Sequence, residues 1–240
     1  MPPNTTKIKE FFDTQAEAYD SARRLGHINY PGGQYFRKQL SEIVNPFIKG
    51  EMKVLEFGAG TGAYTYIFSN TDSKVVSLDI SLEMLLESKK KNPDSHFVVA
   101  DAHNLPFKKG SFDLVVGVNA FSYFSNKDKA LSEIKDVLGE GGRIIICDMN
   151  GYSPLWNLVK TGRQKEVLVY LPQSNRKFLR TLFQSYRIKI LSLREFSWIP
   201  YWANRWMVYI FRPIEAALTK VPLLKRLALR ILIIGEKIAN

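Results

Sequence analysis

The chain has little that could form covalent or metal cross-links: one cysteine, Cys147, and three histidines among 240 residues. A lone cysteine excludes an internal disulfide framework and a cysteine-rich zinc site, so no metal site is expected. No uncharged stretch reaches the roughly eighteen residues that a transmembrane helix needs. The first ten residues have no apolar segment typical of a signal peptide. These absences predict a soluble, cytoplasmic chain.

Acidic residues are scarce in the last part of the sequence. Residues 151–240 contain 16 Lys/Arg but only 4 Asp/Glu, whereas residues 1–150 are nearly neutral, with 18 and 19. All four tryptophans lie in the same basic part. This asymmetry indicates a negatively charged partner, either nucleic acid or an anionic membrane surface. The overall composition, 45% hydrophobic and 24% charged, excludes wholesale disorder.

Short apolar runs in the first two thirds of the chain predict buried strands. Their apolar residues occupy consecutive positions, which is typical of strands covered on both faces. Helical segments separate them: one follows Ser81, a predicted N-cap, and another is closed by glycines at 139, 141 and 142. Five such alternations predict a doubly wound, parallel α/β sheet. The predicted strands are 54–57, 75–78, 97–100, 114–118 and 144–147.

The flanking regions contain further elements of the same domain. Apolar spacing predicts N-terminal helices within residues 1–50, interrupted by a loop at 26–33. The core covers 51–150, and 151–240 forms the C-terminal part. Within that last part we expect a helix at 178–186, a strand at 188–193, an aromatic and basic insertion at 197–228, and a final strand at 229–234.

A glycine-rich turn follows the first predicted strand, and acids end the next two. Gly58, Gly60 and Gly62 permit a tight turn that brings the backbone close to a ligand at a helix N-terminus. Asp79 stands where an acid accepts both hydroxyls of an adenosine ribose. Asp101 ends the third strand. Because the carboxyl ends of adjacent parallel strands meet at one edge of a sheet, the three features together predict a site for an adenosine-containing ligand.

Two features count against a nicotinamide dinucleotide, although Gly58-x-Gly60-x-x-Ala63 satisfies the degenerate fingerprint for one. Glu56 stands two residues before the first glycine, where a carboxylate would repel a pyrophosphate but suit an ammonium group. The third glycine also falls at 62 rather than 63. A nicotinamide-dependent dehydrogenase is therefore the less favoured interpretation.

Residues 54–150 resemble the class I S-adenosylmethionine-dependent methyltransferases, especially the small-molecule group that includes the ubiquinone/menaquinone-type enzymes. The resemblance lies in Val-Leu-Glu-Phe-Gly-Ala-Gly-Thr-Gly and in four later stretches in the same order. Residues 11–20 also resemble the helix that covers the cofactor in these enzymes. The later stretches are Leu-Asp-Ile-Ser (78–81), Ala-Asp-Ala-His-Asn-Leu-Pro-Phe (100–107), Ser-Phe-Asp-Leu-Val (111–115) and Leu-Gly-Glu-Gly-Gly-Arg (138–143).

The resemblance implies a Rossmann-like, mostly parallel seven-stranded sheet that ends in an antiparallel strand, and S-adenosyl-L-methionine as cofactor. It also implies roles for individual residues. Those expected at the methionine end are Glu56, the turn with Gly58, Ala59, Gly60 and Gly62, and Tyr19, which would close over the carboxylate. Those expected elsewhere are Asp79 at the ribose, Ile80, Asp101 and Ala102 at the adenine, and Asn119 near the sulfonium.

No catalytic residue is fixed by the sequence. Methyl transfer from a sulfonium is an in-line displacement in which positioning supplies much of the acceleration, so no triad is expected. A base is useful if the acceptor is a hydroxyl or an acidic carbon. The candidates are His27, Tyr19, Tyr30 and Tyr123, with His27 in a glycine-rich loop preferred; His103 is expected to line the site or be exposed.

The acceptor is the open question. Asn119-Ala-Phe-Ser-Tyr-Phe after the fourth strand is apolar and lacks the prolines typical of base-amino methylases, which favours a small-molecule or lipid-like acceptor. The alternatives are a nucleic-acid methyltransferase and a non-catalytic subunit that binds S-adenosylmethionine. The insertion at 197–228 predicts a peripheral contact with an anionic membrane surface, a lid over the site or, as a third alternative, a contact with nucleic acid. The sequence does not determine an oligomeric state.

Overall fold

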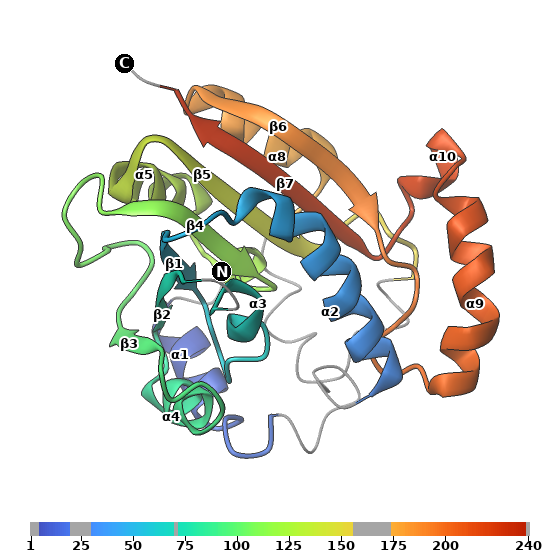
Figure 1. The fold of residues 1–240 in the computed structure, drawn as a ribbon, viewed down its shortest axis with the longest axis horizontal. Helices are drawn as coiled ribbons and strands as arrows, with labels where there is room; N and C mark the ends of the chain where they lie inside the picture. Colours follow the sequence, from blue (N-terminus) through green and yellow to red (C-terminus); the bar gives the residue numbers. More distant parts are fainter. Residues whose placement is uncertain (1–4, 20–29, 70–71, 156–173, 239–240) are drawn as a thin grey trace.

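The computed structural model describes residues 5–19, 30–69, 72–155 and 174–238. A seven-stranded sheet with the strand order β3-β2-β1-β4-β5-β7-β6 forms its centre (Figure 1). The first five strands pair in parallel, and β7 runs antiparallel to both β5 and β6. The expected doubly wound sheet with an antiparallel last strand is confirmed. The strands are β1 (Lys53–Phe57), β2 (Lys74–Asp79), β3 (His96–Val99), β4 (Phe112–Val118), β5 (Leu138–Met149), β6 (Ile188–Phe196) and β7 (Arg230–Lys237).

Helices cover both faces of the sheet. The predicted N-cap, Ser81, is confirmed: its hydroxyl oxygen accepts a hydrogen bond from the N–H of Met84 at 3.1 Å. The helices are α1 (Thr5–Asp13), α2 (Pro31–Val44), η1 (Asn45–Phe47), α3 (Thr65–Ser69), α4 (Leu82–Lys91), η2 (Phe121–Tyr123), α5 (Lys127–Val137), α8 (Arg176–Ser185), α9 (Arg205–Leu218) and α10 (Pro222–Lys225).

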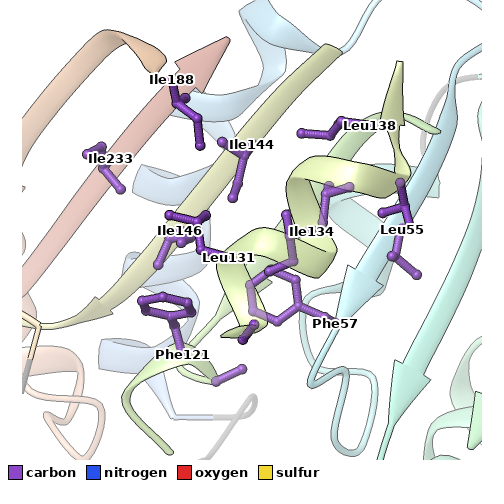
Figure 2. Close-up of a cluster of buried hydrophobic side chains, with 14 of the residues drawn as sticks. Leu55, Phe57, Phe121, Leu131, Ile134, Leu138, Ile144, Ile146, Ile188 and Ile233 are labelled. Carbon is purple, nitrogen blue, oxygen red and sulfur yellow. The ribbon is translucent and has the colours of Figure 1, made fainter. Parts of the chain in front are cut away.

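Apolar residues at consecutive strand positions alternate between two cores. Val115 faces the core that α5 and α8 cover, whereas its neighbours Leu114 and Val116 face α2 and α3. Figure 2 shows Leu131 and Ile134 of α5 packed over side chains of the sheet. Burying a side chain of this size contributes about 1.5–3 kcal/mol, so the two cores hold the strand ends firmly in place. Cys147 is fully buried in the second core, as expected for a structural residue.

Three expected boundaries are wrong. Helix α1 ends at Asp13 and gives way to turns up to Tyr19, although the apolar spacing predicts helix up to the loop at 26–33. The loop expected at 26–33 ends earlier, because α2 begins at Pro31, whose fixed φ suits a first helical position. The strand expected at 144–147 begins earlier, since β5 starts at Leu138 directly after α5 and includes the glycines at 139–142. Its pairing with β4 shifts register between Leu138 and Arg143.

The insertion between β6 and β7 contains α9 and α10, as expected for a helical insertion before the last strand. Helix α9 lies beside α2 at the side of the molecule (Figure 1). The buried carboxylate of Glu215 joins the two, accepting hydrogen bonds from Gln39 Nε2 at 3.1 Å and from the N–H of Trp198 at 3.0 Å. Among the described residues, no helix has the length and apolar character that crossing a bilayer requires.

Candidate functional site

A cavity lies at the edge of the sheet where the parallel strands end. Its walls come from the residues at the ends of β1 to β5, from the beginning of β7, and from α1, which covers it. Antiparallel β7 contributes its first residue, Arg230, because that residue pairs with Met149 near the end of β5. Ligands of doubly wound sheets bind at this edge. The cavity is therefore the candidate functional site.

The glycine turn after β1 forms one wall. Gly58 has a φ of +61°, and a Cβ added there would lie 2.3 Å from the Cβ of Ala120, so only glycine fits. Gly60, with a φ of +54°, faces open space and lines the cavity. Ala59 lines it as well. The turn thus exposes backbone without side chains to whatever the cavity holds.

Asp79 ends β2 beside this turn. Its side chain lines the cavity, and its two oxygens accept hydrogen bonds from backbone N–H groups: Oδ2 from Gly60 at 2.8 Å and Oδ1 from Ser81 at 3.0 Å. Desolvation raises the pKa of Asp79, while these backbone hydrogen bonds act in the opposite direction. Each carboxylate oxygen can accept a further hydrogen bond, so the oriented carboxylate can still receive ligand hydroxyls.

Asp101 and His103 form a second polar corner beyond β3, which ends at Val99 rather than at Asp101. Asp101 Oδ1 accepts a hydrogen bond from the N–H of His103 at 2.9 Å and lies 2.6 Å from His103 Nδ1. His103 Nε2 accepts from the N–H of Asn126 at 3.3 Å, which places the ring proton on Nδ1, facing the carboxylate. His103 lines the cavity, as do Ile80 and Ala102.

Two expected site residues do not line the cavity. Glu56 is 2% exposed and lies beneath the turn, where its carboxylate accepts hydrogen bonds from the hydroxyls of Thr65 at 2.6 Å and Ser77 at 3.1 Å. Burial raises the pKa of Glu56 to about 7. Gly62 packs against α4 instead. Glu56 therefore lies behind the cavity wall, and its direct contact with the methionine end of the cofactor stays a prediction.

Helix α1 covers the cavity, and a polar contact at its end ties it to the core. Ile8 and Phe12 line the cavity, and so does Tyr19 in the turns that follow. The hydroxyl of Ser81 donates to Asp13 Oδ1 at 2.6 Å, which joins the end of α1 to the cap of α4. This contact thus holds the end of α1 at the cavity, beside the residues that were expected to close over the cofactor.

Asn119, at the end of β4, is the centre of a hydrogen-bonded cluster. It has a φ of +57°, a conformation that asparagine tolerates better than most residues. Its amide Nδ2 donates to the hydroxyls of Tyr201 at 2.8 Å and Tyr64 at 3.1 Å, and its Oδ1 accepts from Arg230 Nη1 at 2.6 Å. All four residues line the cavity. The cluster combines segments from four separate parts of the chain.

Asp148 and Lys127 are two buried ionisable groups near the same end of the cavity as the Asn119 cluster. Asp148 lines the cavity; its Oδ2 accepts from the hydroxyl of Ser174 at 3.0 Å, and its Oδ1 has no partner of proper geometry among the described residues. Burial raises the pKa of Asp148 to about 6 and lowers that of Lys127 to about 8. A carboxyl group with this pKa can accept a proton near neutral pH.

Of the four catalytic candidates, two line the cavity, one is described but does not line it, and one lies outside the described residues. Tyr19 and Tyr123 line the cavity, with Phe12 in ring contact with both. Tyr30 precedes α2, is 40% exposed and is not among the described residues that line the cavity, so its catalytic role stays a prediction. His27 lies outside the described residues.

Sequence reasoning missed three residues that the cavity brings together. Asp148 follows an apolar run just as Asp79 does, and that repetition could have identified it. Arg230 is a charged residue at the start of an otherwise apolar strand. Tyr64 had no comparable signal, since only the fold places it against Asn119.

The residues at one end of the cavity fit S-adenosylmethionine. Asp79 presents an oriented acceptor for ribose hydroxyls, and Asp101 presents one for an amino group. Apolar side chains of Leu78, Ile80 and Met84 surround them, as an adenine ring requires. The glycine turn leaves room for close approach by the rest of the molecule.

Comparisons with known proteins agree with this geometry. Residues 55–146 match a family model described as a methyltransferase domain. A demethylmenaquinone methyltransferase of Streptomyces avermitilis is 30% identical over 166 residues, which cover 69% of each chain. A protein of the same name from Thermotoga maritima is 34% identical over 143 residues, which cover 58% of this chain and 59% of that one. The matched region thus spans about six to seven tenths of these relatives.

Solved structures show the same fold at lower sequence identity. A methyltransferase of Thermotoga maritima has a TM-score of 0.70 at 16% identity, covering 96% of this chain and 99% of that one. The cyclase SpnF has a TM-score of 0.72 at 15% identity, covering 100% and 98%. These two likenesses concern the fold alone. From the curated relatives and the family model, the chain belongs to the class I S-adenosylmethionine-dependent methyltransferases of the ubiquinone/menaquinone type.

Proposed function

We propose that this methyltransferase acts on a small, lipid-like aromatic acceptor of the reduced-quinone kind. One observation supports this most directly: the same cavity has a polar end that suits adenosine and an end rich in aromatic and apolar side chains. The names of the relatives, demethylmenaquinone methyltransferase and ubiquinone/menaquinone biosynthesis C-methyltransferase, point to the same acceptor class. The residues at the second end include Phe12, Tyr123, Met149, Tyr201 and Leu229.

On this proposal Asp79 and Asp101 hold the adenosine half of S-adenosylmethionine, with Ile80 and Ala102 beside them. The glycine turn and Asn119 lie along the remaining half. When bound, the cofactor supplies an electrophilic methyl group on a sulfonium sulfur. The contribution of the chain is to align that group with the acceptor, since orienting two reactants is worth about 7–11 kcal/mol over a bimolecular encounter.

Water exclusion and proton acceptance are the other contributions. Helix α1 covers one side of the cavity, and Pro200 and Tyr201 close another. An acceptor that reacts at a phenolic oxygen, or at a ring carbon beside one, must lose a proton. We assign the acceptance of that proton to Asp148, which lines the cavity and whose pKa burial raises to about 6. Tyr19 and Tyr123 would then shape the acceptor end.

We also propose that α9 and α10 rest on an anionic membrane surface, from which a lipid-like acceptor enters. Their outer face is apolar and strongly exposed: Trp206 and Tyr209 are each 74% exposed and Leu223 is 72% exposed. Arg212 and Arg226 are exposed on the same two-helix segment. Exposed aromatic and basic side chains on one segment suit a membrane interface, and each basic residue adds about 1 kcal/mol near anionic lipid.

The first part of the insertion suits the expected role of a lid, and the later part suits the expected role of a membrane contact. Tyr201 lines the cavity, and Trp198 and Trp202 are half-buried, which suits a lid. Much of the segment after them is exposed, including Trp206, Tyr209 and Leu223. Gly32 explains how the first part is anchored: its N–H donates to the carbonyl of Ala203 at 3.0 Å, and an added Cβ would lie 2.2 Å from the carbonyl oxygen of Pro200.

Methyl transfer to a defined acceptor tests the proposed activity. The purified protein is incubated with labelled S-adenosylmethionine and a reduced, short-chain demethylmenaquinone, and with lipid and RNA fractions of a cell extract in parallel. We expect label in the quinol and the lipid fraction. Label in RNA alone would instead favour a nucleic-acid methyltransferase, and tight cofactor binding without any labelled product would favour a non-catalytic subunit.

Sedimentation with vesicles tests the membrane contact. We expect binding to anionic but not to neutral vesicles, weakened by salt and by the double variant Arg212→Gln with Arg226→Gln. The matched control replaces two exposed lysines of α4, Lys89→Gln with Lys90→Gln, on an element far from α9 in Figure 1. Equal loss in both double variants would indicate a general charge effect, and no sedimentation with any vesicle would contradict the proposal.

A further inference from the structure

Arg230 is a buried cation at the cavity wall, and none of the described acids is its partner. It is 3% exposed and lines the cavity from the first position of β7. No carboxylate forms an ion pair with it in the part of the chain that the structure describes. Buried charges are normally paired, because removing an ion from water costs several kcal/mol. A lone guanidinium at a cavity therefore indicates an anion from outside the chain.

The protein holds this guanidinium in a fixed orientation. Its Nη1 donates to Asn119 Oδ1 at 2.6 Å and also contacts Met149 Sδ. Its central carbon lies over the rings of Tyr201, at 4.0 Å from the centroid, and Phe36, at 4.6 Å. Ring contacts of this kind partly compensate the charge. They leave the donors on Nε and Nη2 without a partner among the described residues, although neither atom is sealed from the cavity.

The neighbouring side chains add another donor. The hydroxyls of Tyr64 and Tyr201 both accept from Asn119 Nδ2, and they lie 3.2 Å apart, so one donates to the other. Two hydroxyls carry two protons, and this arrangement uses only one of them. Desolvation raises the pKa of Tyr201 to about 12, which keeps its hydroxyl protonated. The cluster therefore has more donors than acceptors.

The position of Arg230 in the sheet separates it from the adenosine end. Asp79 ends β2 and Asp101 follows β3, both on one side of β1, whereas Arg230 begins β7, on the other side and beyond β4 and β5. A cofactor whose adenosine lies at this corner would extend along the strand ends. The methyl acceptor that reacts with it would then lie toward β5 and β7.

We propose that Arg230, together with the Tyr64–Tyr201–Asn119 cluster, binds a negatively charged oxygen of the methyl acceptor, of the phenolate or enolate class. This inference rests on the proposed function, whose acceptor carries ring hydroxyls. Ionisation of such a hydroxyl increases the electron density on the oxygen and on the adjacent ring carbons, which makes either a better methyl acceptor. The cationic cluster stabilises the ionised form of the acceptor over the neutral one.

The test compares two probes of nearly equal shape, para-nitrophenol and its neutral methyl ether para-nitroanisole, on protein saturated with S-adenosylhomocysteine. The phenolate is coloured, so its absorbance reports both binding and ionisation. We expect the phenolate to bind at least tenfold more tightly than the ether, and the apparent pKa of bound para-nitrophenol to lie below that of the free phenol. Arg230→Met should weaken phenolate binding about tenfold to a hundredfold while leaving ether binding unchanged.

Two further variants separate the charge from its geometry and from the fold. Arg230→Lys keeps the charge and should restore part of the preference for phenolate. Arg143→Met removes a half-buried arginine of β5 that forms an ion pair with Glu236 of β7. This variant should keep the preference for the phenolate over the ether. Melting temperatures and the affinity for S-adenosylhomocysteine, measured for each variant, establish that it is folded.

Three results would overturn the inference. The first is a wild-type protein that binds neither probe or binds both equally well. The second is an Arg230→Met variant that loses both probes to the same degree, which would make the residue purely structural. The third is an Arg230→Met variant that loses S-adenosylhomocysteine but not methylthioadenosine, since Arg230 would then hold the cofactor carboxylate. A wild-type chain that fails to bind S-adenosylhomocysteine would instead contradict the proposed function itself.

Discussion

The backbone N–H of Gly60 donates a hydrogen bond to Asp79 Oδ2 at 2.8 Å, which joins the turn after β1 to the end of β2. Asp79 has a second backbone donor, the N–H of Ser81. The carboxylate is therefore fixed before any ligand arrives, and a ligand that uses it loses little conformational entropy on binding. The first prediction concerns this carboxylate.

Asp79→Ala should weaken binding of S-adenosylhomocysteine about tenfold to a hundredfold, because hydrogen bonds to a charged group are each worth about 1.5–3 kcal/mol. Titration calorimetry measures the change. Asp94→Ala, at an exposed acid after α4, is the matched control and should bind normally. An unchanged dissociation constant for Asp79→Ala would reduce Asp79 to a structural role in the turn.

Gly58→Ala should destabilise the protein more than Gly60→Ala does. Both residues have positive φ, so each alanine costs about 1–2 kcal/mol of backbone strain. Only the alanine at 58 also meets Ala120, at 2.3 Å from its Cβ. We expect thermal denaturation to show a loss of about 2–4 °C for each kcal/mol, with the larger loss at 58. Equal losses would mean that the turn and β4 separate easily.

Asp13→Ala should speed the release of S-adenosylhomocysteine several-fold with little change in melting temperature. Asp13 accepts from the hydroxyl of Ser81 and thereby holds α1 over the cavity. Stopped-flow displacement measures the release rate. Glu10→Ala, at an exposed position of the same helix, is the control. The same release rate in both variants would show that α1 does not need this contact to stay closed.

Glu56→Gln should be more stable than the wild type at alkaline pH and about equally stable at acidic pH. Burial raises the pKa of Glu56 from 4.5 to about 7, so the fold favours the protonated form. The resulting contribution is fully present below the unfolded pKa and is lost as the pH rises through about 7, with a total of up to about 3 kcal/mol. Glutamine does not ionise and keeps an oxygen for Thr65 and Ser77. Melting temperatures across this range should converge at low pH and diverge in favour of the variant above neutrality, whereas the exposed-site control Glu51→Gln should follow the wild type.

If the carboxylate of Asp148 takes up the proton that the methyl acceptor loses, Asp148→Asn should lower kcat by about a hundredfold to ten-thousandfold. Burial raises the pKa of Asp148 to about 6, so wild-type activity should rise with pH through this value, and the variant should lose that rise. Ser174→Ala removes a hydrogen bond that stabilises the charged form and should move the profile to higher pH. An Asp148→Asn variant with a normal pH profile would exclude Asp148 as the base.

Local sequence patterns determined the frame of this protein. Consecutive apolar positions in β1, β4 and β5 predict strands buried on both faces, because neighbouring side chains point to opposite sides of a strand. The N-cap at Ser81 and the acids at 79 and 101 are equally local, since each requires only a strand end and the turn after it. The parallel order of the strands then places those ends at one edge.

The rest of the site was decided by tertiary structure. Glu56 and Asp79 are both acids near strand ends, yet side-chain alternation buries Glu56 under the turn and leaves Asp79 at the cavity. Arg230 lies 111 residues from Asn119 in the sequence and reaches it only because β7 runs antiparallel and begins at the edge where the parallel strands end. No local pattern fixes the pairing partner or direction of a distant strand, so a cluster assembled across four segments follows only from the packing of the whole domain.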